Sequence, residues 1–274
     1  MKKDKLTQLK TLAYSVRKNI IDMAEHGGCY IGSAYSCVEL IVYLYENFMK
    51  YDFAEPANKD RDLLFLSKGH AVSALYSYFV EKKILSRERL KNHQCVKDDI
   101  YLHPNPSIAG IEFHSGSLGH LLSIGVGAAL NFKSKKLDNR VIVILGDGEL
   151  NEGSNWEALM IASAQNLDNL LLLIDRNKFQ ANFRTEDLIP IEPLFDKLKA
   201  FGCSVFSVHG HSFQSIEECF SQFSLCSKKP IAVIANTTRG KGIKSYEDDW
   251  EKWFVEITTN EKTELLNQLQ IINE

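Results

Sequence analysis

The chain has 274 residues, of which 45% are hydrophobic, so it is long enough to bury the core of one large domain or of two small ones. Its 32 basic and 35 acidic residues give a net charge of −3 without any long basic run, which argues against nucleic acid or an anionic membrane as a partner. The six cysteines show no metal-binding spacing, and no apolar run approaches the ~18 residues of a membrane span, so we expect a cytoplasmic protein with reduced thiols.

Hydrophobic periodicity in the first half of the chain predicts four helices and one strand. Helical spacing of apolar residues indicates helices over Leu6 to Ala24 and over Ser36 to Phe48. A short apolar strand over Asp62 to Leu66 leads into a helix over Ala71 to Lys82. A loop rich in Pro and Gly then precedes a helix over Leu121 to Phe132.

The second half continues this alternation of strands and helices. The pattern predicts, in order, a strand Val141 to Leu145, a helix Asn151 to Gln165, a strand Leu170 to Ile174, a loop Asn182 to Pro193, a helix Leu194 to Phe201, a strand Ser204 to Val208, a helix Phe213 to Phe223, a strand Pro230 to Asn236 and a helix Asn260 to Asn273. Alternating strands and helices are typical of an α/β fold with a doubly wound parallel sheet flanked by helices, which binds ligands at the carboxyl edge. No linker divides the chain, so we expect a single domain over residues 1–274.

The stretch from Val141 to Gln180 is the centre of this organisation. Its first strand is a continuous run of apolar, mostly β-branched residues, as expected of a parallel strand buried on both faces. Gly146-Asp147-Gly148 follows this strand directly. The spacing within the following helix predicts that Trp156, Leu159, Met160 and Ala164 share one face. Asn177 follows the second strand, so Asp147 and Asn177 should face each other at the sheet edge.

An aspartate and an asparagine at this edge can bind a hard divalent cation. Mg²⁺ prefers oxygen ligands, and the carboxylate of Asp147, the amide oxygen of Asn177 and the backbone carbonyl of Phe179 offer three, which leaves other positions for a diphosphate. Both residue types also serve other purposes, since Asp is a common helix N-cap and Asn a common turn residue. The two residues alone leave these alternatives open.

Further motifs make the chain resemble the transketolase family. Gly146-Asp147-Gly148 with Asn177 thirty residues after the aspartate resembles the thiamine diphosphate signature. The other motifs that occur in the order of the family are Ser67-Lys68-Gly69-His70-Ala71, Leu102-His103-Pro104, Ser115-Gly116-Ser117-Leu118-Gly119-His120, Glu192-Pro193-Leu194 and Arg239-Gly240-Lys241-Gly242. The resemblance covers roughly residues 5 to 255.

The resemblance implies a set of site residues and a cofactor, thiamine diphosphate with Mg²⁺. By this resemblance His70 would reach the diphosphate and the substrate, His103 would bond the hydroxyl of the two-carbon unit, and Tyr30 would lie on the substrate side. The cofactor-binding residues would be His70, Gly116, Leu118, Gly146, Asp147, Gly148, Glu149 and Asn177, with Asp147, Asn177 and Phe179 on the metal. Glu152 and Glu157 are expected to belong to the cofactor-binding set as well, since they match glutamates that link two active sites at a subunit interface.

The chain departs from ordinary transketolases in two ways. Tyr30 and Phe254 stand where the family has substrate-side histidines. The sequence also ends after the first of the family's domains, without the glutamate that acts on the aminopyrimidine, an acid–base function the cofactor requires. We therefore expect this chain to be the N-terminal subunit of a split transketolase. The complete enzyme would be a heterotetramer of two copies of this chain and two copies of a pyrimidine-binding C-terminal subunit. We expect the sugar substrates of this enzyme to be modified ones, and we expect activity only when the C-terminal subunit is present.

Three other functions are compatible with the sequence. One is an acyloin-forming subunit that uses a 2-oxo acid, although His103 argues against it because an acetyl-type unit has no hydroxyl at that carbon. Another is a regulatory subunit that binds the cofactor without turnover. The replacement of two family histidines by Tyr30 and Phe254 suggests this function. The third is a Mg²⁺-dependent phosphotransferase or phosphatase with Asp147 as nucleophile, which leaves Ser67 to Ala71 unexplained.

Overall fold

A five-stranded parallel sheet forms the centre of the computed structural model, which describes residues 1–223, 228–269 and 271–272. The strands lie in the order β1-β2-β3-β7-β6, and every neighbouring pair is parallel. Their bounds are Leu63–Leu66 for β1, Val141–Gly146 for β2, Leu170–Arg176 for β3, Ser204–His209 for β6 and Ile231–Asn236 for β7. The prediction of an α/β fold with a parallel sheet is confirmed.

The direction in which strands are added reverses within this sheet. From β1 to β3 each strand lies beside the previous one, whereas β6 forms the edge and β7 returns to pair with β3. Ligands of open α/β sheets bind outside the carboxyl ends of the strands near such a reversal. This edge carries the residues that follow β1, β2, β3 and β7.

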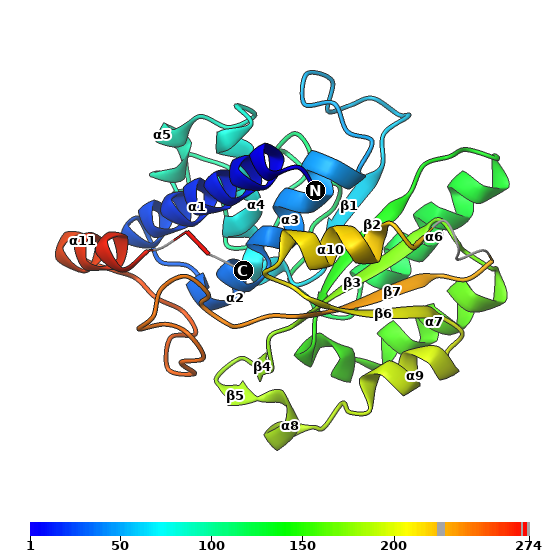
Figure 1. The fold of residues 1–274 in the computed structure, drawn as a ribbon. Helices are drawn as coiled ribbons and strands as arrows, with labels where there is room; N and C mark the ends of the chain where they lie inside the picture. Colours follow the sequence, from blue (N-terminus) through cyan, green and yellow to red (C-terminus); the bar gives the residue numbers. More distant parts are fainter. Residues whose placement is uncertain (224–227, 270, 273–274) are drawn as a thin grey trace.

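Helices cover both faces of the sheet (Figure 1). One face packs on α1, α2, α3, α4 and α10, and the other on α6, α7 and α9. The bounds on the first face are Lys3–Glu25 for α1, Ile31–Ser36 for α2, Val38–Tyr43 for α3, Val72–Glu81 for α4 and Phe213–Phe220 for α10. On the second face α6 is Leu121–Ser134, α7 Gly153–Ala164 and α9 Leu194–Ala200, while α5 (Arg87–Leu90) and α11 (Thr259–Gln268) lie beside α1. Strands buried on both sides explain the uninterrupted apolar runs in the sequence.

Several predicted helices differ from the structure in extent. The helix expected over Ser36 to Phe48 begins earlier, as α2, bends at Cys37, and ends in a wider π turn, Leu44–Phe48. The loop expected over Asn182 to Pro193 contains the short helix α8, Thr185–Leu188. It also contains β5, Phe183–Arg184, which pairs with β4, Phe179–Gln180. The last helix, expected over Asn260 to Asn273, ends already at Gln268, because Leu269 is extended; Asn273 itself lies outside the described residues.

The predicted face of α7 is wrong in part. Leu159 is buried and Trp156 half-buried, but the Met160 side chain is 61% exposed and Ala164 is exposed as well. The buried face consists of Asn155, Ala158, Leu159 and Ala162. Because α7 is apolar almost all round, spacing alone does not define the side that meets the sheet.

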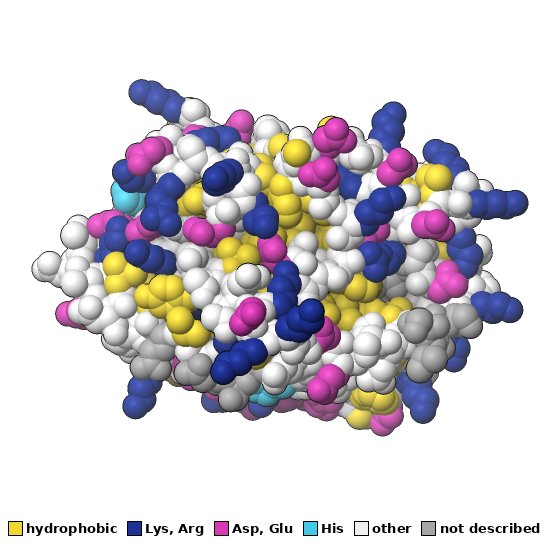
Figure 2. All heavy atoms as spheres, turned by 45° about the horizontal axis from the view of Figure 1, so that its top comes forward, with side chains coloured by type: hydrophobic (Ala, Val, Ile, Leu, Met, Phe, Trp, Pro, Cys, Tyr) yellow, Lys and Arg dark blue, Asp and Glu magenta, His cyan; other side chains and the backbone are white. Residues whose placement is uncertain are grey.

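The molecular surface fits the expectations drawn from composition. Figure 2 shows basic and acidic side chains interspersed over one face, with apolar areas between them and no region of a single charge. Within the described part of the chain, none of the helices has the length and apolar character needed to cross a bilayer.

Candidate cofactor-binding site

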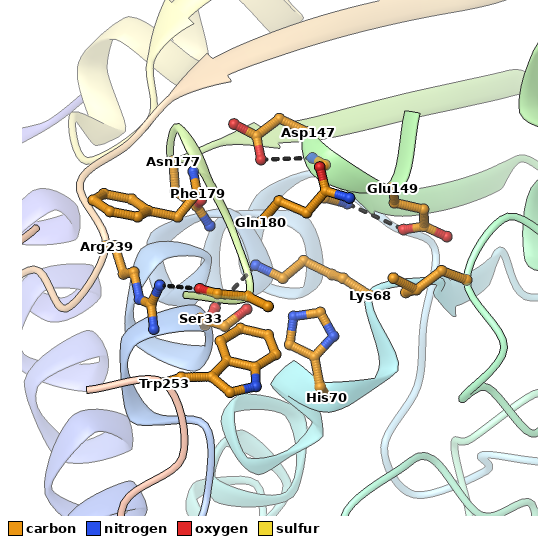
Figure 3. A pocket seen from close by; sticks show the side chains of 14 residues that line it. Ser33, Lys68, His70, Asp147, Glu149, Asn177, Phe179, Gln180, Arg239 and Trp253 are labelled. Atoms are coloured by element: carbon orange, nitrogen blue, oxygen red, sulfur yellow. Dashed lines mark hydrogen bonds between the residues drawn. The ribbon is translucent and has the colours of Figure 1, made fainter. Parts of the chain in front are cut away.

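A cavity of about 240 Å³ opens at the carboxyl edge of the sheet. Residues that follow four strands line it, together with α2 and the segment before α11 (Figure 3). The lining residues are Ser33, Lys68, His70, Leu118, Gly146, Asp147, Gly148, Glu149, Asn177, Phe179, Gln180, Ala181, Arg239 and Trp253. The structure thus brings together eight of the residues selected from sequence: His70, Leu118, Gly146, Asp147, Gly148, Glu149, Asn177 and Phe179.

Asp147 lies directly after β2 and its side chain is only 1% exposed. One carboxylate oxygen accepts hydrogen bonds from the Arg176 guanidinium at 2.7 Å and from the backbone N–H of Lys178 at 2.6 Å. The other accepts from the N–H of Gly148 at 2.8 Å, which caps the 3₁₀ turn Gly148–Asn151. Burial raises the pKa of Asp147 to about 6, against the opposing effect of Arg176, so this carboxylate is ionised at neutral pH but favours a cationic ligand.

Asn177 forms the turn that leads from β3 into β4. Its side-chain oxygen accepts a hydrogen bond from the N–H of Phe179 at 3.0 Å, and its amide nitrogen donates to Asp175 at 3.2 Å. The capping and turn roles of Asp147 and Asn177 are therefore real, yet both side chains also line the cavity. Capping and ligand binding are compatible, because the Asp147 oxygen bonded to Gly148 and the Asn177 amide oxygen each accept a single hydrogen bond and retain a further lone pair.

The oxygen atoms around Asp147 and Asn177 are suitable ligands for a hard cation. Asp147, Asn177 and the carbonyl of Phe179 are all oxygen donors, of the kind that Mg²⁺ accepts together with a diphosphate. Among the described residues no group of three or more His, Cys, Asp or Glu side chains forms a metal cage, as expected of a site with a single carboxylate. A metal here depends on oxygen atoms from its ligand to complete its shell.

Glu149 connects the loop after β1 and the loop before α6 at the carboxyl end of β2. Its carboxylate is buried and accepts hydrogen bonds from the hydroxyl of Ser67, from the N–H of Gly119 at 2.9 Å and from the N–H of Gly146 at 3.1 Å. Burial raises the pKa of Glu149. The residue therefore holds the loop that carries Leu118 against the sheet edge, and lines the cavity from there.

His70 lies on the side of the cavity opposite Asp147, beside Trp253 (Figure 3). Burial lowers the pKa of His70 well below its usual value, and the nearby positive charges of Lys68 and Arg239 act in the same direction. The imidazole is therefore neutral at pH 7, able to donate one hydrogen bond and to accept another.

Arg239 is the most informative residue that the sequence analysis left without a role. Its side chain is 1% exposed and its guanidinium lies between the rings of Phe179 and Trp253, 5.1 and 5.2 Å from their centroids. One nitrogen donates to the carbonyl of Ala181 at 2.6 Å, but Nε and Nη2 have no partner within the part of the chain that the structure describes. Burial lowers the pKa of Arg239 to about 10. A buried cation with free donors in a cavity is suited to an anionic ligand such as a diphosphate.

Four rings close one side of the cavity, and we call Tyr30, His70, Trp253 and Phe254 the aromatic wall. The Tyr30 ring lies 5.6 Å from His70, 4.8 Å from Trp253 and 5.2 Å from Phe254. Two backbone hydrogen bonds between Cys29 and Val255, of 2.9 and 3.0 Å, fix the two segments of the wall to each other. His70 and Trp253 line the cavity itself, whereas Tyr30 and Phe254 do not, so these two rings form the second layer of the wall.

The remaining residues selected from sequence lie outside the cavity. A methyl group added at Gly116 would be 3.6 Å from the ring of His103, so these two residues adjoin each other. Burial lowers the pKa of His103, which is half-buried. Glu152 and Glu157 are exposed at the start of α7, where Glu152 packs on Gly119. Neither glutamate is among the described residues that line the cavity.

Fold and cavity define a class of protein, an α/β domain that holds an anionic cofactor at the carboxyl edge of its sheet. Residues 9–253 match the family model described as the transketolase, thiamine diphosphate binding domain. The chain belongs to this family, whose cofactor is thiamine diphosphate with a divalent metal such as Mg²⁺.

Two named relatives are similar over most of their own length. The chain is 36% identical over 263 residues to one subunit of the apulose-4-phosphate transketolase of Phocaeicola vulgatus, a match that covers 94% of this chain and 92% of that protein. It is 36% identical over 236 residues to the 6-deoxy-6-sulfo-D-fructose transketolase subunit SqwG of a Clostridium species, covering 85% and 86%. Transketolase from Campylobacter jejuni superposes with a TM-score of 0.85 at 26% identity, over 97% of this chain but only 43% of that one. The resemblance to the N-terminal subunit of a split transketolase is thereby confirmed.

Proposed function

We propose that the chain is the diphosphate-binding subunit of a two-component transketolase, which moves a two-carbon ketol unit between a ketose and an aldose. The observation that carries the proposal is the convergence of Asp147, Asn177 and Arg239 on one cavity, where two of the three guanidinium nitrogens of Arg239 have no hydrogen-bond partner among the described residues. In this proposal Asp147, Asn177 and the Phe179 carbonyl hold Mg²⁺, while Arg239 and the backbone at Gly148 contact the diphosphate. When bound, thiamine diphosphate supplies the nucleophilic ring carbon that accepts and donates the two-carbon unit.

The histidines and the aromatic wall would serve the substrate. Because burial keeps His70 neutral, it can hold a proton on one ring nitrogen and accept one on the other during transfer. His103 is also kept neutral by burial, and in this proposal it bonds a substrate hydroxyl. The rings of Tyr30 and Trp253 pack on each other at this side and would reduce the access of water to the cavity, which would strengthen the polar interactions inside.

We further propose that the enzyme assembles from two copies of this chain and two copies of a separate pyrimidine-binding subunit in the cytoplasm. Relatives of similar length that are themselves named as transketolase subunits support a partner. On α7 the side chains of Met160 and Ile161 are exposed, and they lie on the same short helix as Glu157. Such an apolar strip beside a carboxylate fits the expected contact between two copies. The purified chain alone should be inactive, and ketol transfer without any partner would contradict this assembly.

The sugars are proposed to be modified ones. Two relatives carry names that specify apulose 4-phosphate and 6-deoxy-6-sulfo-D-fructose. In this chain Tyr30 and Phe254 replace two imidazoles that the family places near the reacting carbonyl, and loss of one such donor typically costs about 10²–10³ in rate. An enzyme for ordinary pentose phosphates would not be expected to tolerate both replacements.

The test is a substrate panel with the reconstituted pair of subunits. Ketoses, aldoses and 2-oxo acids are assayed with the natural chain, with Tyr30→His and with Phe254→His, and with Trp250→His as a control, because Trp250 is exposed and outside the aromatic wall. We expect turnover of a modified ketose that both wall variants reduce and the control leaves unchanged. Efficient use of xylulose 5-phosphate with ribose 5-phosphate, unaffected by either wall variant, would overturn the assignment of modified sugars. Turnover of 2-oxo acids alone would overturn ketol transfer.

A further inference from the structure

Asp175, at the end of β3, is a fully buried carboxylate beneath the floor of the cavity. It is 0% exposed and does not line the cavity. Four side chains donate hydrogen bonds to it: Ser36 at 2.5 Å, Asn177 at 3.2 Å, and Lys68 and Thr237 at shorter range. Ser36, Lys68 and Asn177 all donate to one carboxylate oxygen, and Thr237 donates to the other, so both oxygens are held in place.

The four donors come from four different segments of the chain. Ser36 ends α2, Lys68 follows β1, Asn177 follows β3, and Thr237 follows β7. Each of these segments also supplies a residue that lines the cavity, namely Ser33, His70, Phe179 and Arg239. Asp175 therefore joins the four segments directly below the place where their other residues meet.

We propose that Asp175 is a positioning residue, which fixes the Asn177 amide so that its oxygen faces the proposed metal site beside Asp147. Because the amide nitrogen is bonded to Asp175, the amide oxygen must point the other way, toward the N–H of Phe179 and the cavity. This inference rests on the proposed role of Asn177 as a metal ligand. Partners behind a metal ligand typically contribute about 10–100-fold to metal affinity.

A competing role is that Asp175 only neutralises Lys68. The Lys68 ammonium is buried, pairs with Asp175 and donates to the Ser33 carbonyl at 3.0 Å. The two roles predict opposite effects of Asp175→Asn on cofactor binding. If Asp175 is only a counter-ion, its loss leaves one more positive charge beside the cavity, and a diphosphate should bind equally well or more tightly. If Asp175 positions Asn177, the affinity should fall.

The experiment measures the affinity of the reconstituted pair of subunits for thiamine diphosphate at a fixed Mg²⁺ concentration, by calorimetry and by quenching of tryptophan fluorescence. Asp175→Asn is compared with Asp62→Asn. Asp62 is likewise buried and accepts hydrogen bonds from the N–H groups of Lys50 and Arg140, but it lies just before β1, at the opposite edge of the sheet. We expect the dissociation constant to rise about 10–100-fold in Asp175→Asn and to stay within about twofold in Asp62→Asn, although both variants unfold at lower temperature.

A second variant keeps the inference testable if Asp175→Asn does not fold. Thr237→Val removes one donor to Asp175 while keeping the shape of the side chain, and we expect it to weaken cofactor affinity at least threefold with kcat at saturation unchanged. An unchanged or lower dissociation constant in a folded Asp175→Asn or Thr237→Val variant would overturn the positioning role. Because the readout is binding, a negative result in the substrate panel leaves this test unaffected.

Discussion

Replacing Arg239 by methionine is expected to stabilise the cofactor-free chain and to weaken cofactor binding. The Arg239 guanidinium is buried and forms no ion pair with the acidic side chains that the structure describes, and burial lowers its pKa from the usual 12.5 to about 10 against the opposing charges of Asp249 and Asp248. At about 1.4 kcal/mol per pKa unit, keeping this cation charged in the folded chain costs on the order of 3 kcal/mol. Methionine fills a similar volume between Phe179 and Trp253 without a charge.

The effect on binding has the opposite sign. A hydrogen bond to a charged group contributes about 1.5–3 kcal/mol, so losing one contact between Arg239 and a diphosphate should raise the dissociation constant about 10–150-fold. The assay combines urea unfolding at pH 7 without cofactor, where we expect a gain of about 1–3 kcal/mol, with calorimetric titration of thiamine diphosphate and Mg²⁺ in the presence of the partner subunit.

Arg17→Met is the matched control. Arg17 is also 1% exposed, but its guanidinium forms two hydrogen bonds with Glu39, of 2.6 and 2.8 Å, and it does not line the cavity. Removing it leaves the buried Glu39 carboxylate without its guanidinium, with the His211 imidazole still 2.9 Å away, and should cost about 3–5 kcal/mol of unfolding free energy. If Arg239→Met also destabilises the cofactor-free chain, or binds the cofactor as tightly as the natural chain, then Arg239 is a structural residue and the reasoning fails.

Three other changes have definite expected outcomes. Asp147→Ala should abolish Mg²⁺-dependent binding of thiamine diphosphate in calorimetry with the partner subunit, and undiminished affinity would exclude this aspartate as the metal ligand. Burial lowers the pKa of His93, so the unfolded chain binds more protons below about pH 6.5 and unfolding free energy should decrease from pH 7 to pH 5. His93→Gln should reduce that decrease in urea titrations at each pH, and an equal slope in both proteins would contradict the role of His93. Gly28 has a φ of +76° and a methyl group there would lie 2.6 Å from the Phe254 ring, so Gly28→Ala should lower unfolding free energy by about 1 kcal/mol or more and displace Phe254; an unchanged melting curve would contradict the contact.

The central unit of the fold could be predicted because its local pattern and its tertiary environment agree. Strands β2 and β3 are continuous apolar runs, and such runs are stable only between two layers of helices. Asp147 and Asn177 follow these strands directly, so their meeting at one edge is a consequence of parallel pairing. Helix α7 shows the limit of this approach. Met160 and Ala164 satisfy the predicted helical spacing but are exposed, because periodicity does not determine which side of an apolar helix meets the sheet.

The role of Arg239 could not be obtained from its motif. Arg239-Gly240-Lys241-Gly242 indicates the family, but whether a cation is paired depends on which side chains surround it in space. Phe179 and Trp253 surround the guanidinium, and they come from different segments of the chain. The same is true of Asp175, which no motif marks and whose four donors meet only in the folded sheet.

The hydrogen bonds between Cys29 and Val255 join segments that lie near opposite ends of the sequence. Bringing them together closes a very long loop, which costs chain entropy that only the folded sheet can offset. The aromatic wall is therefore expected to close after the sheet and to open before it, so hydrogen exchange at these two amides should be faster than in β2 and β3. The sheet edge would then determine cofactor affinity and the aromatic wall would determine substrate choice, in two parts of the molecule that differ in stability. Substitutions in the wall could therefore alter which sugar is accepted without disturbing the sheet that holds the diphosphate.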